Sequence, residues 1–191
     1  MAASEWWGAG QPSATAVSGG RLLLFYSRGD SSSTAMLWHE ADLSDAAHPI
    51  LGPERLLPVA GLTNEGGGPD NLLQGAALAY DAVQDIFWLV RPGHPFPLDC
   101  PDWISDSLQI ATLPSADLWT GGGAWTLRAE VTSGITNSHR IFDPVFIRNA
   151  FGGLATGSDP DVLVSTAGDC PDWLWSYRYH VVSDQGSRNR P

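Results

Sequence analysis

The stretch Asp99-Cys100-Pro101-Asp102-Trp103 decides the organisation of this chain, because Asp169-Cys170-Pro171-Asp172-Trp173 repeats it letter for letter. Both cysteines of the chain lie in these two copies. Each copy follows one strand-like run and precedes another; the four runs are residues 85–90, 107–111, 161–165 and 175–181. The same acidic, aromatic loop therefore joins the same two strands in successive units. A period of this size predicts a repeat architecture.

The strand-like runs fall into three units separated by turn and linker signals rich in glycine. We therefore expect a single all-β, β-propeller-like domain over residues 1–191, with about three four-stranded antiparallel blades. The third unit has three strand candidates and then a polar tail. Residues 34–47 have helix-like spacing in places, but their position in the repeat favours a strand, so we predict no helix. The blades are expected at about residues 11–60, 72–132 and 140–182.

Composition limits the classes of partner. The net charge is −11, and all ten basic residues are arginines, which argues against nucleic acid and against an anionic membrane. No apolar run approaches the ~18 residues of a membrane span, and the first ten residues do not resemble a signal peptide. The compartment stays open between the cytosol and a piece excised from a secreted protein. We expect four tryptophans to pack in the core: Trp38, Trp88, Trp119 and Trp125.

Two phrases resemble a particular group of propellers. Residues 142–148 carry an Asp143-Pro144 pair at the start of an expected inner strand, and residues 110–119 end in Ser-Ala-Asp-Leu-Trp. Both are similar to the five-bladed arabinanase-, xylosidase- and levansucrase-like glycosidases. The resemblance implies carbohydrate recognition and extends to glycoside hydrolysis at a loop-rich mouth. Gln11-Pro12 and Gly75-Ala76 stand where that family's acidic residues would be sought. The alternative is a non-catalytic binding or scaffold module, a fragment of a larger carbohydrate-active protein.

Glycoside hydrolysis needs two carboxyl groups that flank one bond. Asp143 is the first candidate, because the resemblance places it at the mouth of an inner strand. The alternative is an aspartate that hydrogen-bonds a turn at the strand's start. The partner acid stays open among four residues: Asp30, Asp81, Asp102 and Glu130.

The repeated loops are expected to gather at one end of a central channel. Trp103 and Trp173 would then offer flat apolar faces to sugar rings, while neighbouring aspartates accept hydrogen bonds from hydroxyl groups. Alternatively, each tryptophan packs under its own loop and each aspartate caps a turn. The aspartates also have the oxygen ligands that calcium prefers, although their spacing matches no known calcium loop; we expect no other cofactor or metal. These aspartates are Asp99, Asp102, Asp169 and Asp172.

Three basic residues are candidates for the same mouth, namely Arg91, His94 and His139, against the alternative of ordinary loop polarity. The two cysteines occupy equivalent positions in neighbouring units. A disulfide needs Cα atoms within ~7 Å, and loop tips of adjacent blades are expected to lie farther apart. The pairing of Cys100 with Cys170 is therefore left open, with separate thiols favoured.

An incomplete set of blades predicts assembly. Open blades leave sheet faces and edges unsatisfied, and exposed apolar faces usually mark an interface. We expect a homodimer or larger oligomer, with the outer blades of one copy meeting those of the other. The alternative is a longer natural protein of which this chain is a part.

Overall fold

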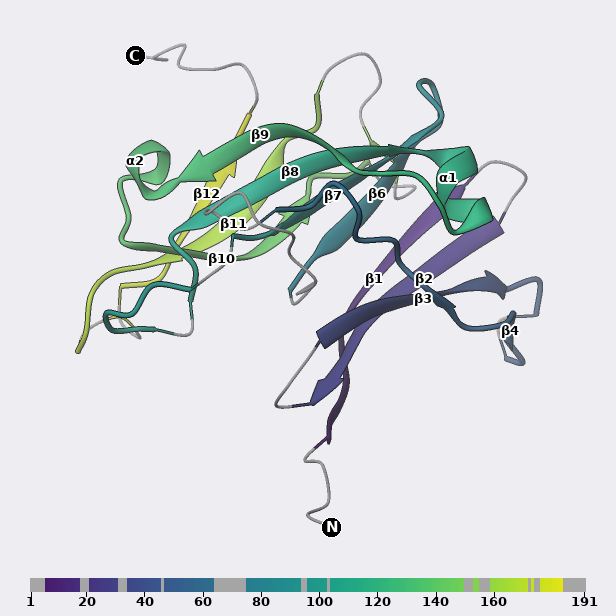
Figure 1. Ribbon diagram of the computed structural model, residues 1–191, viewed down its shortest axis with the longest axis horizontal. Coiled ribbons are helices and arrows are strands. Elements are labelled where there is room, and N and C mark those ends of the chain that lie inside the picture. The colour runs from purple at the N-terminus through teal and green to yellow at the C-terminus, as the bar shows by residue number, and fades with distance from the viewer. Residues whose placement is uncertain are drawn as a thin grey trace.

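The computed structural model describes residues 6–17, 21–30, 34–45, 47–63, 75–93, 96–102, 104–149, 153–154, 159–171, 173 and 176–183. The described residues form three antiparallel sheets that follow one another in chain order (Figure 1). The first sheet has the order β1-β2-β3-β4, with β5 also paired to β3; the second has the order β6-β7-β8-β9; the third has the order β10-β11-β12. We refer to them as the first, second and third sheets.

After the first strand of each sheet, each strand is paired with the strand before it in the sequence, except β5, which pairs with β3. Those of the first sheet are β1 (Trp6–Val17), β2 (Arg21–Asp30), β3 (Thr34–Asp42), β4 (Ile50–Leu51) and β5 (Arg55–Leu56). Those of the second are β6 (Ala77–Asp81), β7 (Ile86–Pro92), β8 (Ser107–Pro114) and β9 (Thr126–Thr132). Those of the third are β10 (Arg140–Phe146), β11 (Val162–Ala167) and β12 (Arg178–Val182).

The prediction of an all-β chain is confirmed, and residues 34–42 form a strand rather than a helix. The prediction of no helix is wrong, because α1 (Ser115–Thr120) and α2 (Ser133–Thr136) are short helices on either side of β9. Each ends at a residue with left-handed backbone, Gly121 and Asn137, which are residue types that adopt this conformation readily. No helix in the described ranges is long and apolar enough to cross a membrane.

Two hydrophobic cores hold the sheets face to face. One core lies between the first and second sheets and includes Phe25, Trp38, Phe87 and Trp125. The other lies between the second and third sheets and includes Trp88. Both faces of the second sheet are covered by another sheet. This agrees with the near-continuous apolar sequence of its strands. Trp38, Trp88 and Trp125 are buried as expected, and Trp119 is partly buried against the first core.

The first strand of each sheet lies beside the first strand of the next, because β1 contacts β6 and β6 contacts β10. Three residues at corresponding places have left-handed backbone: Gln11 (φ 51°), Gly75 (φ 66°) and Asp143 (φ 46°). At Gln11-Pro12 and at Asp143-Pro144 the register shifts, so these pairs form bulges in β1 and β10. A left-handed residue therefore lies within β1 and β10 and just before β6.

Candidate functional site

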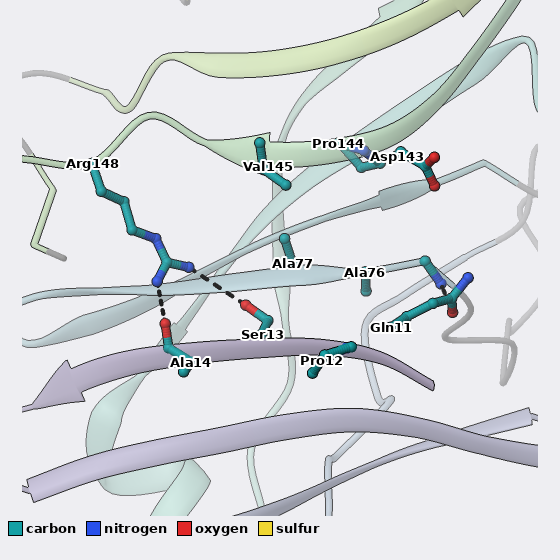
Figure 2. Close-up of a pocket in the computed structure, with 11 residues that line it drawn as sticks. Gln11, Pro12, Ser13, Ala14, Ala76, Ala77, Asp143, Pro144, Val145 and Arg148 are labelled. Atoms are coloured by element: carbon teal, nitrogen blue, oxygen red, sulfur yellow. Dashed lines mark hydrogen bonds between the residues drawn. The ribbon is translucent and has the colours of Figure 1, made fainter. Parts of the chain in front are cut away.

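A cavity of about 420 Å³ lies between the first strands of the three sheets. Its lining combines an apolar floor with a few polar groups, as small-ligand sites do. Figure 2 shows Gln11 and Asp143 at one end and Arg148 at the other, with Ala76 and Ala77 between them. The three left-handed positions thus converge on one space.

Asp143 is the carboxyl group of this cavity, and among the described lining residues it is the only one. Its carboxyl group makes no hydrogen bond or ion pair with another described residue. The residue keeps solvent exposure, yet burial of the carboxyl group by surrounding protein atoms raises its pKa above the ordinary value. Such a group, facing a cavity and held by an uncommon backbone conformation, is available to a ligand.

Gln11 occupies the position of the first sheet that Asp143 occupies in the third. Its Oε1 accepts a hydrogen bond of 2.6 Å from the backbone N–H of Gly75. Gln11 therefore ties the first sheet to the start of β6 at the edge of the cavity. Gly75 presents no side chain there, which leaves the second sheet without a polar group at its corresponding position.

Arg148 follows β10 and closes the other end of the cavity. Its guanidinium donates hydrogen bonds to the backbone oxygens of Ala14 in β1 and Leu78 in β6. It thereby links all three sheets, and burial lowers the pKa of this guanidinium. Sequence reasoning did not identify Arg148 as part of the site, because nothing in the phrase 142–148 distinguishes it from an exposed strand arginine.

The repeated loops are joined by a disulfide between Cys100 and Cys170, whose Cα atoms are 5.7 Å apart. The expectation that separate thiols are favoured is therefore wrong. It assumed that the loop tips of neighbouring units diverge. They converge instead, since both reach the segment that precedes β10. Both Cys–Pro peptide bonds are cis.

His139 lies between the two loops. Its Nε2 is 3.0 Å from Asp99 Oδ2, and its Nδ1 is 3.0 Å from Asp169 Oδ1. Both ring nitrogens can donate only when the imidazole carries both protons. The structure thus brings together three predicted site residues, and their contacts with one another join the two loops at the start of β10.

Arg140 supports the first loop from beneath. Its side chain is 2% exposed, and its guanidinium donates to the backbone oxygens of Asp99 and Pro101, each at 2.9 Å, and to Asp99 Oδ1 at 2.7 Å. The hydrogen bond from Arg140 is the main reason that the pKa of Asp99 lies below its ordinary value. Sequence reasoning missed Arg140, although its place directly after His139 was a signal that could have found it.

Trp173 of the second loop lies in an aromatic group that extends to Phe142. Its ring centroid is 5.9 Å from that of Tyr177, which is 5.0 Å from that of Phe142, the neighbour of Asp143. Burial, and then the negative charge of Asp143, raise the pKa of Tyr177. Trp173 is half-buried beside these neighbours.

Other predicted residues lie elsewhere. Arg91 is 0% exposed and donates to Thr63 O and Gln109 Oε1, so it is not available to a ligand at the mouth. Asp81 is buried and caps its own turn through the backbone N–H groups of residues 83 and 84. Neither lies in the lining of the cavity.

Glu130 lies on β9, the last strand of the second sheet, away from the cavity. Asp102 is exposed in the first loop, and the backbone of Asp30 ends β2. Asp81, Asp102 and Glu130 are not among the described residues that line the cavity beside Asp143. Three predicted residues lie outside the described ranges: His94, Trp103 and Asp172.

Across the described ranges, no group of three or more His, Cys, Asp or Glu side chains is arranged to hold a metal ion. The suggestion of calcium at the repeated aspartates therefore gains no support. No protein-family profile matches the chain, and no curated protein matches it significantly in sequence.

Proposed function

We propose that this chain is a carbohydrate-binding protein with a β-propeller-like arrangement, and that the sugar occupies the cavity between β1, the start of β6 and β10. The observation that carries the proposal is Asp143, an unpaired carboxyl group among the described residues, which faces a cavity of about 420 Å³ from a left-handed bulge. The propeller-like arrangement is supported by three antiparallel sheets whose first strands lie together.

The chemistry of the lining suits a neutral, polyhydroxylated ligand. The apolar groups, including Pro12, Ala76, Ala77 and Val145, can pack against the C–H faces of a sugar ring. The carboxylate of Asp143 can accept hydrogen bonds from hydroxyl groups, and hydrogen bonds to charged groups are the stronger kind. A net charge of −11 disfavours anionic ligands.

The repeated loops extend this site at its mouth. The register pairs Ala77 with Val90, so β6 starts at the same end of the second sheet at which β7 ends and the first loop begins. His139 places both loops at the corresponding end of β10. Trp173 then offers an aromatic face beside the cavity, and the described contacts favour a second contact point for a sugar chain.

Hydrolysis is the second candidate function, and burial raises the pKa of Asp143, which is the direction that a general acid requires. A glycosidase also needs a second carboxyl group close by. The described cavity lining holds one. Binding is therefore the function that the single chain supports best.

The test is a titration of the protein with hits from a panel of neutral oligosaccharides, followed by a hydrolysis assay on each hit. Asp143→Asn is expected to weaken binding about 10–100-fold, the range for losing a hydrogen bond to a charged group. Trp173→Ala is expected to weaken it less. Asp45→Asn is the matched control, because Asp45 is an exposed carboxylate in the turn that follows β3.

Equal affinity for Asp143→Asn and Asp45→Asn would contradict the assignment of the cavity. Release of sugar by the wild type and not by Asp143→Asn would establish the second candidate. No binding across the panel would leave the scaffold function as the better account.

A further inference from the structure

The outer face of the third sheet is apolar and uncovered in the described structure. The register aligns Val145, Leu163 and Val181 across the three strands, and Phe142, Ser165 and Tyr179 beside them. Residues directly opposite one another share a face of the sheet. Val181 is 56% exposed and Tyr179 is 75% exposed. The opposite face, with Phe146, Val162 and Val164, packs on the second sheet.

The outer face of the first sheet is apolar in part. Ala41 and Leu37 are each 5% exposed, and Tyr26 contacts His39 and donates a hydrogen bond to Glu54. The register aligns Ala16, Leu22, Ala41 and Leu51, and it aligns Tyr26 with Leu37, which pairs with Leu56. Leu22 and Leu24 are half-buried, and Leu56 is 62% exposed. The opposite face, which includes Leu23, Phe25 and Trp38, packs on the second sheet.

These two outer faces correspond to faces that already pack together inside the chain. Val145 lies two residues after the left-handed Asp143, and Ala77 lies two residues after the left-handed Gly75. The two residues therefore hold corresponding positions in the third and second sheets. Ala77, Val90 and Ile110 align across the second sheet, and this face packs on the third. The outer face of the third sheet is therefore the face on which a fourth sheet would pack, just as the third sheet packs on the second.

The outer face of the first sheet corresponds to the face of the second sheet that packs on the first. Leu22 and Leu24 correspond to Phe87 and Leu89, because Ala16 pairs with Leu22 as Tyr80 pairs with Phe87. Phe87 and Leu89 lie on the face of the second sheet that packs on the first. The outer face of the first sheet is therefore the face that would pack on a preceding sheet, just as the second sheet packs on the first.

We infer that the outer face of the third sheet of one copy packs on the outer face of the first sheet of a second copy, and that two copies close into a ring of six sheets. The contact continues the sheet-to-sheet packing that the chain makes twice within itself. It is heterologous, so it must close or it would grow into a fibre. Six sheets lie within the ~4–8 blades of closed propellers.

Charge modifies the strength of this contact. Each copy carries a net charge of −11, so two copies repel one another. Added salt screens that repulsion. Association is therefore expected to strengthen as the ionic strength rises.

In such a ring the cavities of the two copies share one centre. Each copy contributes one Asp143, so the ring holds the second carboxyl group that the single cavity lacks. This consequence rests on the proposed function. The assembly itself does not, because it is measured without any sugar.

The experiment is sedimentation velocity over a range of protein concentrations at low and high salt. The wild type is expected to form a two-copy particle. Leu56→Glu and Val181→Glu each place a charge in the contact and should weaken association about 100-fold or more. Ile135→Glu is the control, because Ile135 is 61% exposed in α2, beside β9 of the second sheet. It should associate as the wild type does.

Mixing the two variants is the sharpest step. Leu56→Glu keeps an intact third sheet and Val181→Glu an intact first sheet, so one good contact remains and a two-copy particle should reappear. Thermal unfolding checks that each variant is folded, and Leu51→Glu and Tyr179→Glu replace either one that is not.

Several results would overturn the inference. A wild type that stays monomeric at every concentration and salt would do so, as would a particle larger than two copies. Loss of association with only one of the two variants would mean that a face packs on its own counterpart. Association kept by both variants would place the contact elsewhere. Sugar binding by a monomer would leave the proposed function standing without the ring.

Discussion

The two copies of Asp-Cys-Pro-Asp-Trp are identical in sequence, but the hydrogen bonds that anchor the two loops differ. Arg140, from the start of the third sheet, binds the first loop through two backbone oxygens and a carboxylate. The second loop precedes β12, and no further sheet follows it in the described ranges. In the second loop, Ser176 Oγ accepts from Gly168 N–H at 2.7 Å and donates to Trp173 O at 3.0 Å, and Asp169 contacts His139. A repeated sequence therefore sets the shape of a loop, while the next unit sets its anchoring.

The largest expected effect comes from removing the bond that joins the loops. Replacing both Cys100 and Cys170 by serine should lower the free energy of unfolding by about 4 kcal/mol, because the bridge closes a long segment of chain. Urea unfolding of the double variant measures this loss. Hydrogen exchange should then rise more in the second loop than in the first, which keeps Arg140. Equal loss of protection in both loops would contradict the claim that Arg140 anchors the first loop more strongly than the second.

The next effect separates the loops directly. Arg140→Ala leaves buried backbone oxygens of the first loop without their donor, and should cost about 3 kcal/mol of unfolding free energy. Ser176→Ala is the counterpart in the second loop and should cost about 1 kcal/mol, the usual value of one hydrogen bond. Thermal or urea unfolding compares the two. A larger cost for Ser176→Ala would reverse the comparison.

The smallest effect is electrostatic. The pKa of Asp99 is lowered in the folded protein, chiefly by the hydrogen bond from Arg140. Its contribution to stability is therefore present above the ordinary carboxyl pKa and is lost as the pH falls through the folded value. A carbon-detected NMR titration should find Asp99 titrating below a free aspartate, and Arg140→Ala should move its midpoint upward. An unchanged midpoint in Arg140→Ala would assign the shift to another group.

Much of the fold could be predicted from the sequence, because strand patterns and turn residues are local signals. The runs at 85–90, 107–111 and 161–165 correspond to β7, β8 and β11 to within a few residues. The short helix Ser115–Thr120 was missed because its six residues are too few to show a helical period. Asp143 was identified through a two-residue phrase expected at the start of a strand, and in the structure this phrase is a bulge in the middle of β10.

The rest of the site depends on contacts between distant units, which carry no local signal. The approach of Cys100 to Cys170 follows from where the loops meet, and the burial of Arg91 follows from the packing of its sheet. The partner acid was sought among Asp30, Asp81, Asp102 and Glu130, yet the corresponding positions hold Gln11 and Gly75. Correspondence between the three sheets identifies these positions, and correspondence is visible only once the register is known.

The most direct test of the account locates the sugar on the protein. In a titration followed by amide NMR spectra, the account predicts that a bound oligosaccharide shifts the side-chain amide of Gln11 and the backbone amide of Gly75, which donates to it. The backbone amide of Val83, in the turn at the far end of β6, should stay unchanged. Shifts that avoid Gln11 and Gly75 while binding is saturated would contradict the claim that the cavity between the three sheets is the binding site.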